Sequence, residues 1–178
     1  ANVSSSAHQE RLPSLDKARK YIETQAQAVN NCSFAQYKQC NSSYGSNQLG
    51  TGGGQTICSA GCAMSSVAEM LKHWGVSIDP GQLNQWLIDH NGYADGDLII
   101  WGTVDSFGPT FISDEHPTVA ELQDGINSCH GLIANVMNGE HWVLITGYAG
   151  NNNFYVNDPG FDTATYSYDD MVSVIVYH

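Results

Sequence analysis

The chain has 178 residues, of which 42% are hydrophobic, and its 6 basic and 18 acidic residues give a net charge of -12. This length is typical of one domain with a single core, and no apolar run reaches the roughly 18 residues that a membrane helix requires. The negative charge repels phosphate backbones and anionic lipid surfaces, which argues against nucleic acid and membrane partners. We therefore expect residues 1–178 to form one soluble domain.

The first third of the chain combines a helical pattern with a long polar stretch. Ser14 can cap a helix whose apolar residues recur at helical spacing, which predicts a helix over residues 15–29. Residues 41–55 are rich in glycine, serine and asparagine and are predicted to form a loop. This loop leads almost directly to Cys62.

Two helices are predicted after the loop. The apolar residues of 62–74 fall on one helical face, and Gly75 follows as the C-terminal stop. Asp79 and Pro80 then provide the N-cap and the first residue of a second helix, which is expected to end near residue 91.

The second half of the chain changes from helical to strand patterns. Residues 98–101 fit either a short strand or a buried helical turn, whereas Thr118 and Glu121 form a capping box for a helix to about residue 128. Segments rich in Val, Ile, Tyr and Phe, separated by turns, then predict an antiparallel sheet over 131–137, 141–148, 153–157 and 171–177. Helices followed by strands indicate an α+β domain in which a helical layer packs on the sheet.

The cysteine count indicates an oxidising compartment. Five cysteines without metal-ligand spacing are typical of disulfide-bonded secreted proteins, and an odd number leaves one thiol unpaired. More than one connectivity is open; we prefer Cys32 with Cys40 and Cys58 with Cys129, so that Cys62 is the odd thiol.

Acceptor triplets for N-glycosylation also favour a secretory route. They occur at Asn2, Asn31 and Asn41, all in the first quarter of the chain. Because Ala1 is followed by polar residues rather than an apolar segment, a signal peptide would already have been removed. We therefore expect a secreted protein, or one in another oxidising or lysosome-like compartment.

Three residues have the types and positions that nucleophilic thiol chemistry needs. Cys62 begins a predicted helix, where free backbone N–H groups and the helix dipole favour a thiolate. A histidine must protonate the leaving amine, and a third group must hold the imidazole in place. His141 opens an apolar strand, and Asp158 follows the next strand, so antiparallel pairing can bring the two side by side.

These residues lie in segments that resemble a known family. The segments GCAMSSVAEMLKHWG (61–75), GEHWVLITGY (139–148) and NFYVNDPG (153–160) resemble the peptidases that remove double-glycine leaders from bacteriocins, and especially their stand-alone secreted relatives. The resemblance covers residues 55–178, and residues 1–54 add nothing to it. It implies a papain-like fold and a cysteine peptidase that uses no cofactor, with Cys62 as nucleophile, His141 as general acid and base, and Asp158 as orienting acid.

One position departs from the family pattern. The family has a glutamine about six residues before the cysteine, and its side-chain amide joins the cysteine N–H in the oxyanion hole. Gln55 is the nearest candidate here, but it lies seven residues before Cys62. We expect Gln55 to fill this role; if it points elsewhere, Gln48 or a backbone amide must replace it.

Each candidate also has a structural interpretation. Cys62 fits a small buried apolar residue or half of a disulfide, with Cys58 as the free thiol instead. His141 fits a core histidine, and Asp158 fits a turn residue. The other histidines show no metal-ligand spacing, which gives no reason to expect a metal site.

The sequence therefore predicts a secreted cysteine peptidase that acts as a monomer on peptide or protein substrates, without cofactor, nucleic acid or membrane partners. Two alternatives stay open. The same triad supports an amidase or acyltransferase, and the fold also supports a non-catalytic module that only binds.

Overall fold

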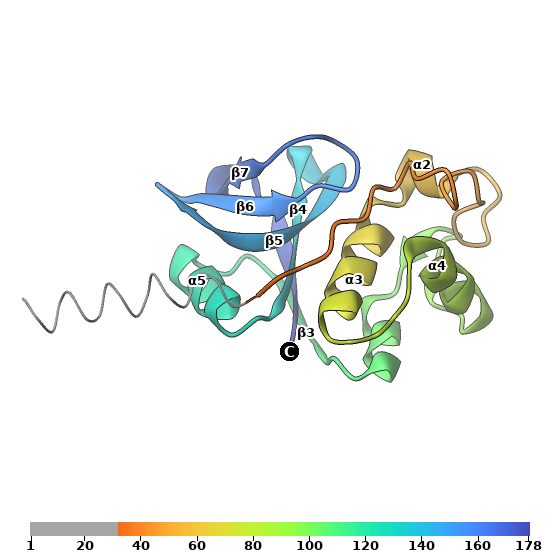
Figure 1. Cartoon of the computed structure of the whole chain (residues 1–178), viewed down its shortest axis with the longest axis horizontal. Helices are drawn as coiled ribbons and strands as arrows, with labels where there is room; N and C mark the ends of the chain where they lie inside the picture. Colours follow the sequence, from red (N-terminus) through yellow and green to blue (C-terminus); the bar gives the residue numbers. More distant parts are fainter. Residues whose placement is uncertain (1–31) are drawn as a thin grey trace, which may run out of the picture. The chain divides into compact units, whose positions relative to one another are not determined.

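A six-stranded antiparallel sheet lies at the centre of the computed structural model, which describes residues 32–178 (Figure 1). The strands follow the order β3-β8-β4-β5-β6-β7 across the sheet. Their bounds are β3 (Phe111–Glu115), β4 (Gly131–Val136), β5 (His141–Gly150), β6 (Asn153–Asn157), β7 (Thr165–Ser167) and β8 (Ser173–Tyr177). The helix expected over residues 15–29 lies outside the described residues.

Helices and short elements surround this sheet. The α-helices are α2 (Ile57–Ala60), α3 (Cys62–His73), α4 (Pro80–Asp89) and α5 (Val119–Asn127). The 3-10 helices are η1 (Trp101–Phe107), η2 (Met137–Gly139) and η3 (Tyr168–Asp170), and β1 (Tyr93–Ala94) pairs with β2 (Leu98–Ile99). None of the helices within residues 32–178 is long and apolar enough to cross a membrane.

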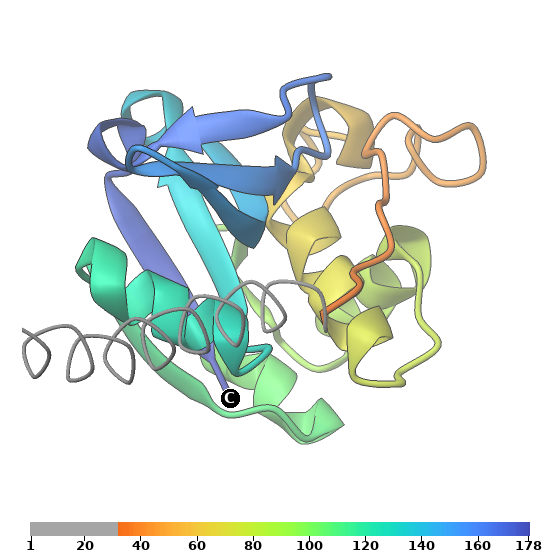
Figure 2. The same ribbon diagram turned by 60° about the vertical axis from the view of Figure 1, so that its left-hand side comes forward.

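The two central strands are covered by helices on both faces. In β4, Ile133 packs into the core cluster that contains the buried residues of α3, whereas Leu132 packs with those of α5. In β5, Leu144 packs into the cluster with α3, and Val143 packs into the cluster with α5. Because successive side chains of a strand point to opposite faces, α3 and α5 lie on opposite sides of the sheet, as Figures 1 and 2 show.

The structure confirms the predicted α+β class and the antiparallel pairing of the later strands. The helices expected at 62–74, from residue 80 and from Thr118 all form; Asp79 is the N-cap of the second, and the third begins with the expected capping box. Strands β3 and β7 were not predicted, because the region of β3 has no clean period and β7 is only three residues long. The segment left open at 98–101 contains β2 and the start of η1.

The predicted disulfide pairs are wrong. Cys32 is bonded to Cys129, and Cys40 is bonded to Cys58. The preference for a short local loop failed because residues 32–40 run from the end of α5 to α2, so their two cysteines lie at opposite ends of the segment (Figure 1). Cys62 is the cysteine that stays free, as expected.

Candidate active site

Cys62 is the first residue of α3 and directly follows Gly61. A Cβ atom on Gly61 would lie 2.5 Å from the carbonyl oxygen of Ile57, so the tight junction between α2 and α3 needs glycine. This junction places the thiol at the amino end of a three-turn helix, where unpaired N–H groups favour negative charge. The Cys62 side chain is nearly buried, with 9% of its surface exposed.

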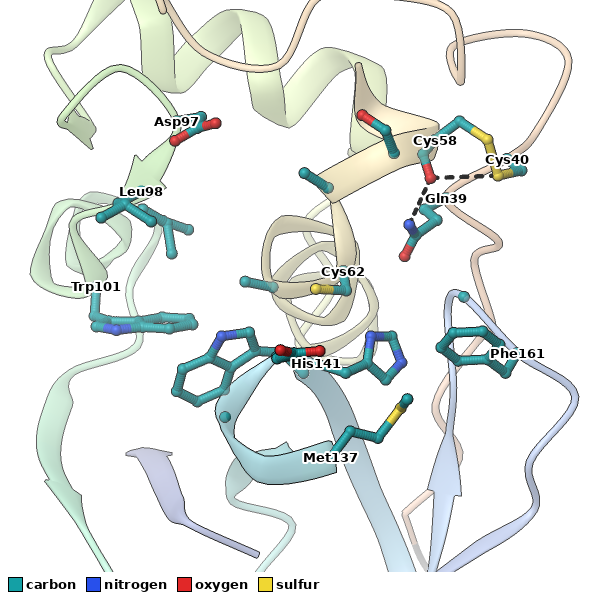
Figure 3. Close-up of a pocket in the computed structure, with 18 residues that line it drawn as sticks. Gln39, Cys40, Cys58, Cys62, Asp97, Leu98, Trp101, Met137, His141 and Phe161 are labelled. Atoms are coloured by element: carbon teal, nitrogen blue, oxygen red, sulfur yellow. Dashed lines mark hydrogen bonds between the residues drawn. A yellow bond between two sulfur atoms is a disulfide. The ribbon is translucent and has the colours of Figure 1, made fainter. Parts of the chain in front are cut away.

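His141 is the first residue of β5 and lies beside the Cys62 sulfur (Figure 3). Its Nε2 atom is 2.7 Å from Oδ1 of Asp158, and the ring lines the same pocket as Cys62. Burial lowers the pKa of His141, but the interactions of the ring with Asp158 and Cys62 outweigh burial and raise the pKa to about 9. The ring therefore favours the imidazolium form at neutral pH.

Asp158 is fully buried directly after β6, where the β5–β6 pairing brings it to His141. Its Oδ1 also accepts hydrogen bonds from the N–H groups of Gly160 and Phe161, both at 2.9 Å, and its Oδ2 accepts one from the Tyr166 hydroxyl at 3.0 Å. Burial raises the pKa of Asp158, but the hydrogen bonds from His141 and these N–H groups hold it below its usual value. The carboxylate is therefore fixed in position and charged.

Gln55 lies outside the pocket that contains Cys62 and His141. Its side chain is exposed, and its Oε1 accepts a hydrogen bond from the Ser59 hydroxyl at 2.7 Å. Gln48, the expected substitute, is also outside this pocket and donates its side-chain amide to the Gly50 carbonyl. The structure thus brings neither glutamine to the thiol.

Gln39 lines the pocket instead and points toward Cys62 (Figure 3). It is 7% exposed, and its Nε2 donates to the Cys58 carbonyl at 2.6 Å. A side-chain amide nitrogen carries two hydrogens, so one remains for a further acceptor. Among residues 32–178, Gln39 is the only glutamine that is buried and the only one that lines this pocket.

The backbone around Gln39 is held between α3 and the loop that follows β6. The Gln39 N–H donates to the Pro159 carbonyl at 3.0 Å, and the Tyr37 N–H donates to Oε1 of Glu69 at 2.6 Å. These hydrogen bonds hold residues 32–40 against α3 and the loop after β6.

Gln39 was not predicted as a site residue because the glycine-rich loop separates it from Cys62 in the sequence. The one sequence feature that could have indicated it is its position directly before that loop.

The Cys62 pocket has a volume of about 750 Å³, which is in the range of ligand-binding sites. In Figure 3 it extends to both sides of Cys62, toward Trp101 and Leu98 on one side and toward Phe161 on the other. Within residues 32–178, no group of three or more His, Cys, Asp or Glu residues is arranged to hold a metal ion.

Comparisons with known proteins identify the family to which this chain belongs. A comparison with curated proteins gives no significant match. Among solved structures, a proposed C39-like peptidase from Bacillus anthracis aligns over 67% of this chain and 88% of its own, with 15% identity and a TM-score of 0.47. The model of the Peptidase_C39 like family matches residues 20–177. The chain therefore belongs to the Peptidase_C39 like family, which points to cysteine peptidase activity.

Proposed function

We propose that this protein is a secreted cysteine peptidase that hydrolyses peptide bonds through Cys62, His141 and Asp158. The observation that carries the proposal is the free thiol at the start of α3, in the same pocket as an imidazole whose Nε2 is held by a buried carboxylate. Membership of a peptidase family makes this arrangement more informative than the same three residue types would be alone.

In the first step, the Cys62 thiolate attacks the carbonyl carbon of the scissile peptide bond. The His141 imidazolium then gives its proton to the leaving amine, and a thioester to Cys62 remains. Asp158 keeps the ring oriented throughout, because its bond to Nε2 leaves Nδ1 for the reacting atoms. A His141 pKa of about 9 keeps this proton available at neutral pH.

In the second step, water attacks the thioester carbonyl while His141 accepts a proton from the water. The C–S bond breaks, the acid product leaves, and the thiolate and imidazolium are restored. Both steps pass through a tetrahedral oxyanion that needs hydrogen-bond donors. We propose that the Cys62 N–H and the Gln39 amide provide them, in place of the expected Gln55.

The two disulfides support an oxidising, extracellular compartment, because such bonds rarely persist in a reducing cytosol. Asn41 is exposed and is compatible with glycosylation, whereas Asn2 and Asn31 lie outside the described residues. The proposed substrate is a peptide or protein, handled by a monomer without a cofactor.

The deciding experiment is thiol labelling with iodoacetamide at pH 6 without reductant, followed by peptide mapping. We expect one fast-reacting site, Cys62, and loss of peptide hydrolysis in proportion to labelling. His141→Ala should slow labelling at least tenfold, as expected when a thiolate loses its partner imidazolium (about 10-fold per 1.4 kcal/mol). His90→Ala, which changes a histidine outside the pocket, serves as the matched control.

Three outcomes would redirect the proposal. Labelling at another cysteine, or only after reduction, would contradict the assignment of Cys62 as nucleophile. A slowly reacting thiol in the unmodified protein would favour a module that only binds. Transfer of the acyl group to an added amine in preference to water would favour an acyltransferase.

A further inference from the structure

The pocket around Cys62 has an apolar wall on one side of the thiol. Trp101 and Trp142 form this wall, with their ring centroids 5.0 Å apart and tilted by 60°. Leu98 extends the wall. It is 58% exposed, although aliphatic side chains are usually buried. An apolar surface beside a proposed nucleophile is suited to a large apolar side chain of the substrate.

Two carboxylates border the same pocket. Asp97 lies next to Leu98 at the apolar wall (Figure 3), and Glu140 directly precedes His141. Neither takes part in the ion pairs of the described residues, which join Lys38 to Asp162 and His141 to Asp158.

No lysine or arginine of the described residues lines the pocket to compensate these charges, and the imidazolium of His141 is already paired with Asp158. Residues 32–178 contain two lysines and no arginine, and neither lysine lines the pocket. Lys38 is occupied by the Phe161 carbonyl at 2.6 Å and the Asp162 carboxylate, and Lys72 lies near the end of α3. A positively charged substrate side chain would supply the missing counter-charge.

We propose that the pocket selects peptides in which a large apolar or aromatic residue, bound against Leu98, Trp101 and Trp142, is accompanied by a nearby lysine or arginine that pairs with Asp97 or Glu140. This inference rests on the proposed peptidase function. The apolar wall provides most of the affinity for the peptide, because burying a large apolar side chain is strongly favourable. The carboxylates discriminate among the peptides that carry such a side chain.

The magnitudes of the two effects differ. Burial of a Leu or Phe side chain corresponds to about 10–100-fold in kcat/KM relative to a small residue. A partly exposed ion pair corresponds to only about 2–5-fold and weakens as salt screens it. The apolar preference should therefore dominate, and the basic preference should be the salt-sensitive part.

The test begins with digestion of a diverse mixture of peptides by the full chain and identification of the cleaved bonds by mass spectrometry. We expect Phe, Leu, Tyr or Trp to be enriched at one position relative to the cleaved bond, with Lys or Arg enriched at a position close to it. Cleavage sites enriched in small or acidic residues, or not enriched at all, would overturn the proposal.

Variants then assign the preference to residues. Trp101→Ala should lower kcat/KM about 10–100-fold for a peptide with Phe at the selected position while changing an Ala peptide little. Asp97→Asn and Glu140→Gln together should remove the preference for Lys over Gln that the unmodified chain shows in low salt. Asp124→Asn, which removes one carboxylate from the exposed surface of α5 outside the pocket, should retain that preference.

A binding arm separates this inference from the proposed function. In Cys62→Ala, which lacks the nucleophile, a peptide containing Phe and Lys should bind more tightly than its counterpart with Gly and Glu, as measured by calorimetry. If no peptide is cleaved but this difference persists, the peptidase function fails and the pocket assignment stands. If peptides are cleaved but neither binding nor cleavage discriminates, the pocket assignment fails alone.

Discussion

Gln39 and Gln55 are two glutamines before the same cysteine in opposite environments, one buried in the pocket and one exposed outside it. Gln39→Ala should lower kcat by about 10²–10³-fold, the usual effect of removing one oxyanion donor. Gln55→Ala should leave kcat unchanged. The measurement is steady-state hydrolysis of a peptide, with iodoacetamide labelling of Cys62 as the parallel readout.

Labelling distinguishes an oxyanion donor from a residue that merely supports the fold. Alkylation of a thiolate forms no oxyanion, so the labelling rate should hardly change in Gln39→Ala. If Gln39→Ala lowers hydrolysis and labelling equally, Gln39 has a structural role. If only Gln55→Ala lowers hydrolysis, Gln55 is the oxyanion donor, as the sequence first indicated.

The charge on Asp158 should set the alkaline limit of activity. With the pKa of His141 raised to about 9, the imidazolium is retained at neutral pH, and activity should fall as pH rises through 9. In Asp158→Asn the hydrogen-bonded charge is lost while burial still lowers the pKa of His141, so this limit should move to lower pH. The pH profile of kcat/KM checks the shift, and an unchanged alkaline limit would contradict the assigned cause.

The same pKa links His141 to stability. A histidine whose pKa is raised by folding stabilises the native state below its unfolded value of 6.5, and this contribution is lost as pH rises through about 9. The stabilising contribution and the proposed catalytic proton therefore disappear over the same pH window.

Glu69 shows a linkage of the same sign, at lower pH and with burial as the cause. It is fully buried in α3, and burial raises its pKa to about 8 although the Tyr37 N–H donates a hydrogen bond to its Oε1. Folding therefore takes up a proton between the ordinary pKa of 4.5 and about 8, so the free energy of unfolding falls as pH rises through that window. Above about pH 8 the Glu69 carboxylate is a buried charge, which destabilises the native state.

Glu69→Gln should be more stable than the unmodified chain at high pH, because glutamine can still accept the Tyr37 hydrogen bond without a charge. The gain should grow from near zero at pH 4 to roughly 4 kcal/mol at pH 8. Urea unfolding at pH 4, 6 and 8 measures it. A difference between the two proteins that does not vary with pH would show that Glu69 does not titrate in this range.

At the scale of elements, residues 32–40 form a segment fixed at both ends by disulfides. Cys32–Cys129 closes a separation of 97 residues, and Cys40–Cys58 closes one of 18. In the loop-entropy description the longer loop contributes about 1.5 kcal/mol more to stability. The shorter one, however, adjoins Gln39 and lines the Cys62 pocket.

The two disulfides should therefore separate stability from activity. Cys32→Ala/Cys129→Ala should lose about 1.5 kcal/mol more stability than Cys40→Ala/Cys58→Ala, whereas the latter should show the larger fall in kcat. Denaturant titration and peptide hydrolysis below the unfolding transition measure the two effects. Parallel losses in both double variants would mean that the segment acts only through global stability.

The elements differ in how well the sequence predicted them. Helix α3 was predicted because its apolar residues repeat at helical spacing over three turns and Gly75 follows. Strand β3 was missed because it pairs along only one of its edges, with β8 at the margin of the sheet, and the pattern there is weak. A long periodic segment can be predicted from its own residues, whereas a short edge strand forms only because a neighbouring strand pairs with it.

At the scale of the whole molecule, the sequence determined the α+β class, the helix that begins at Cys62 and the proximity of His141 to Asp158. These follow from local periodicity and from hairpin pairing, both of which act over a few residues. The catalytic roles of the three residues stay predictions, although the structure brings them together. Tertiary structure alone decided the disulfide connectivity and placed Gln39, rather than Gln55, in the pocket of Cys62. Both depend on the path of residues 32–40 between α3 and the loop after β6, and contacts between segments so distant in sequence leave no local pattern.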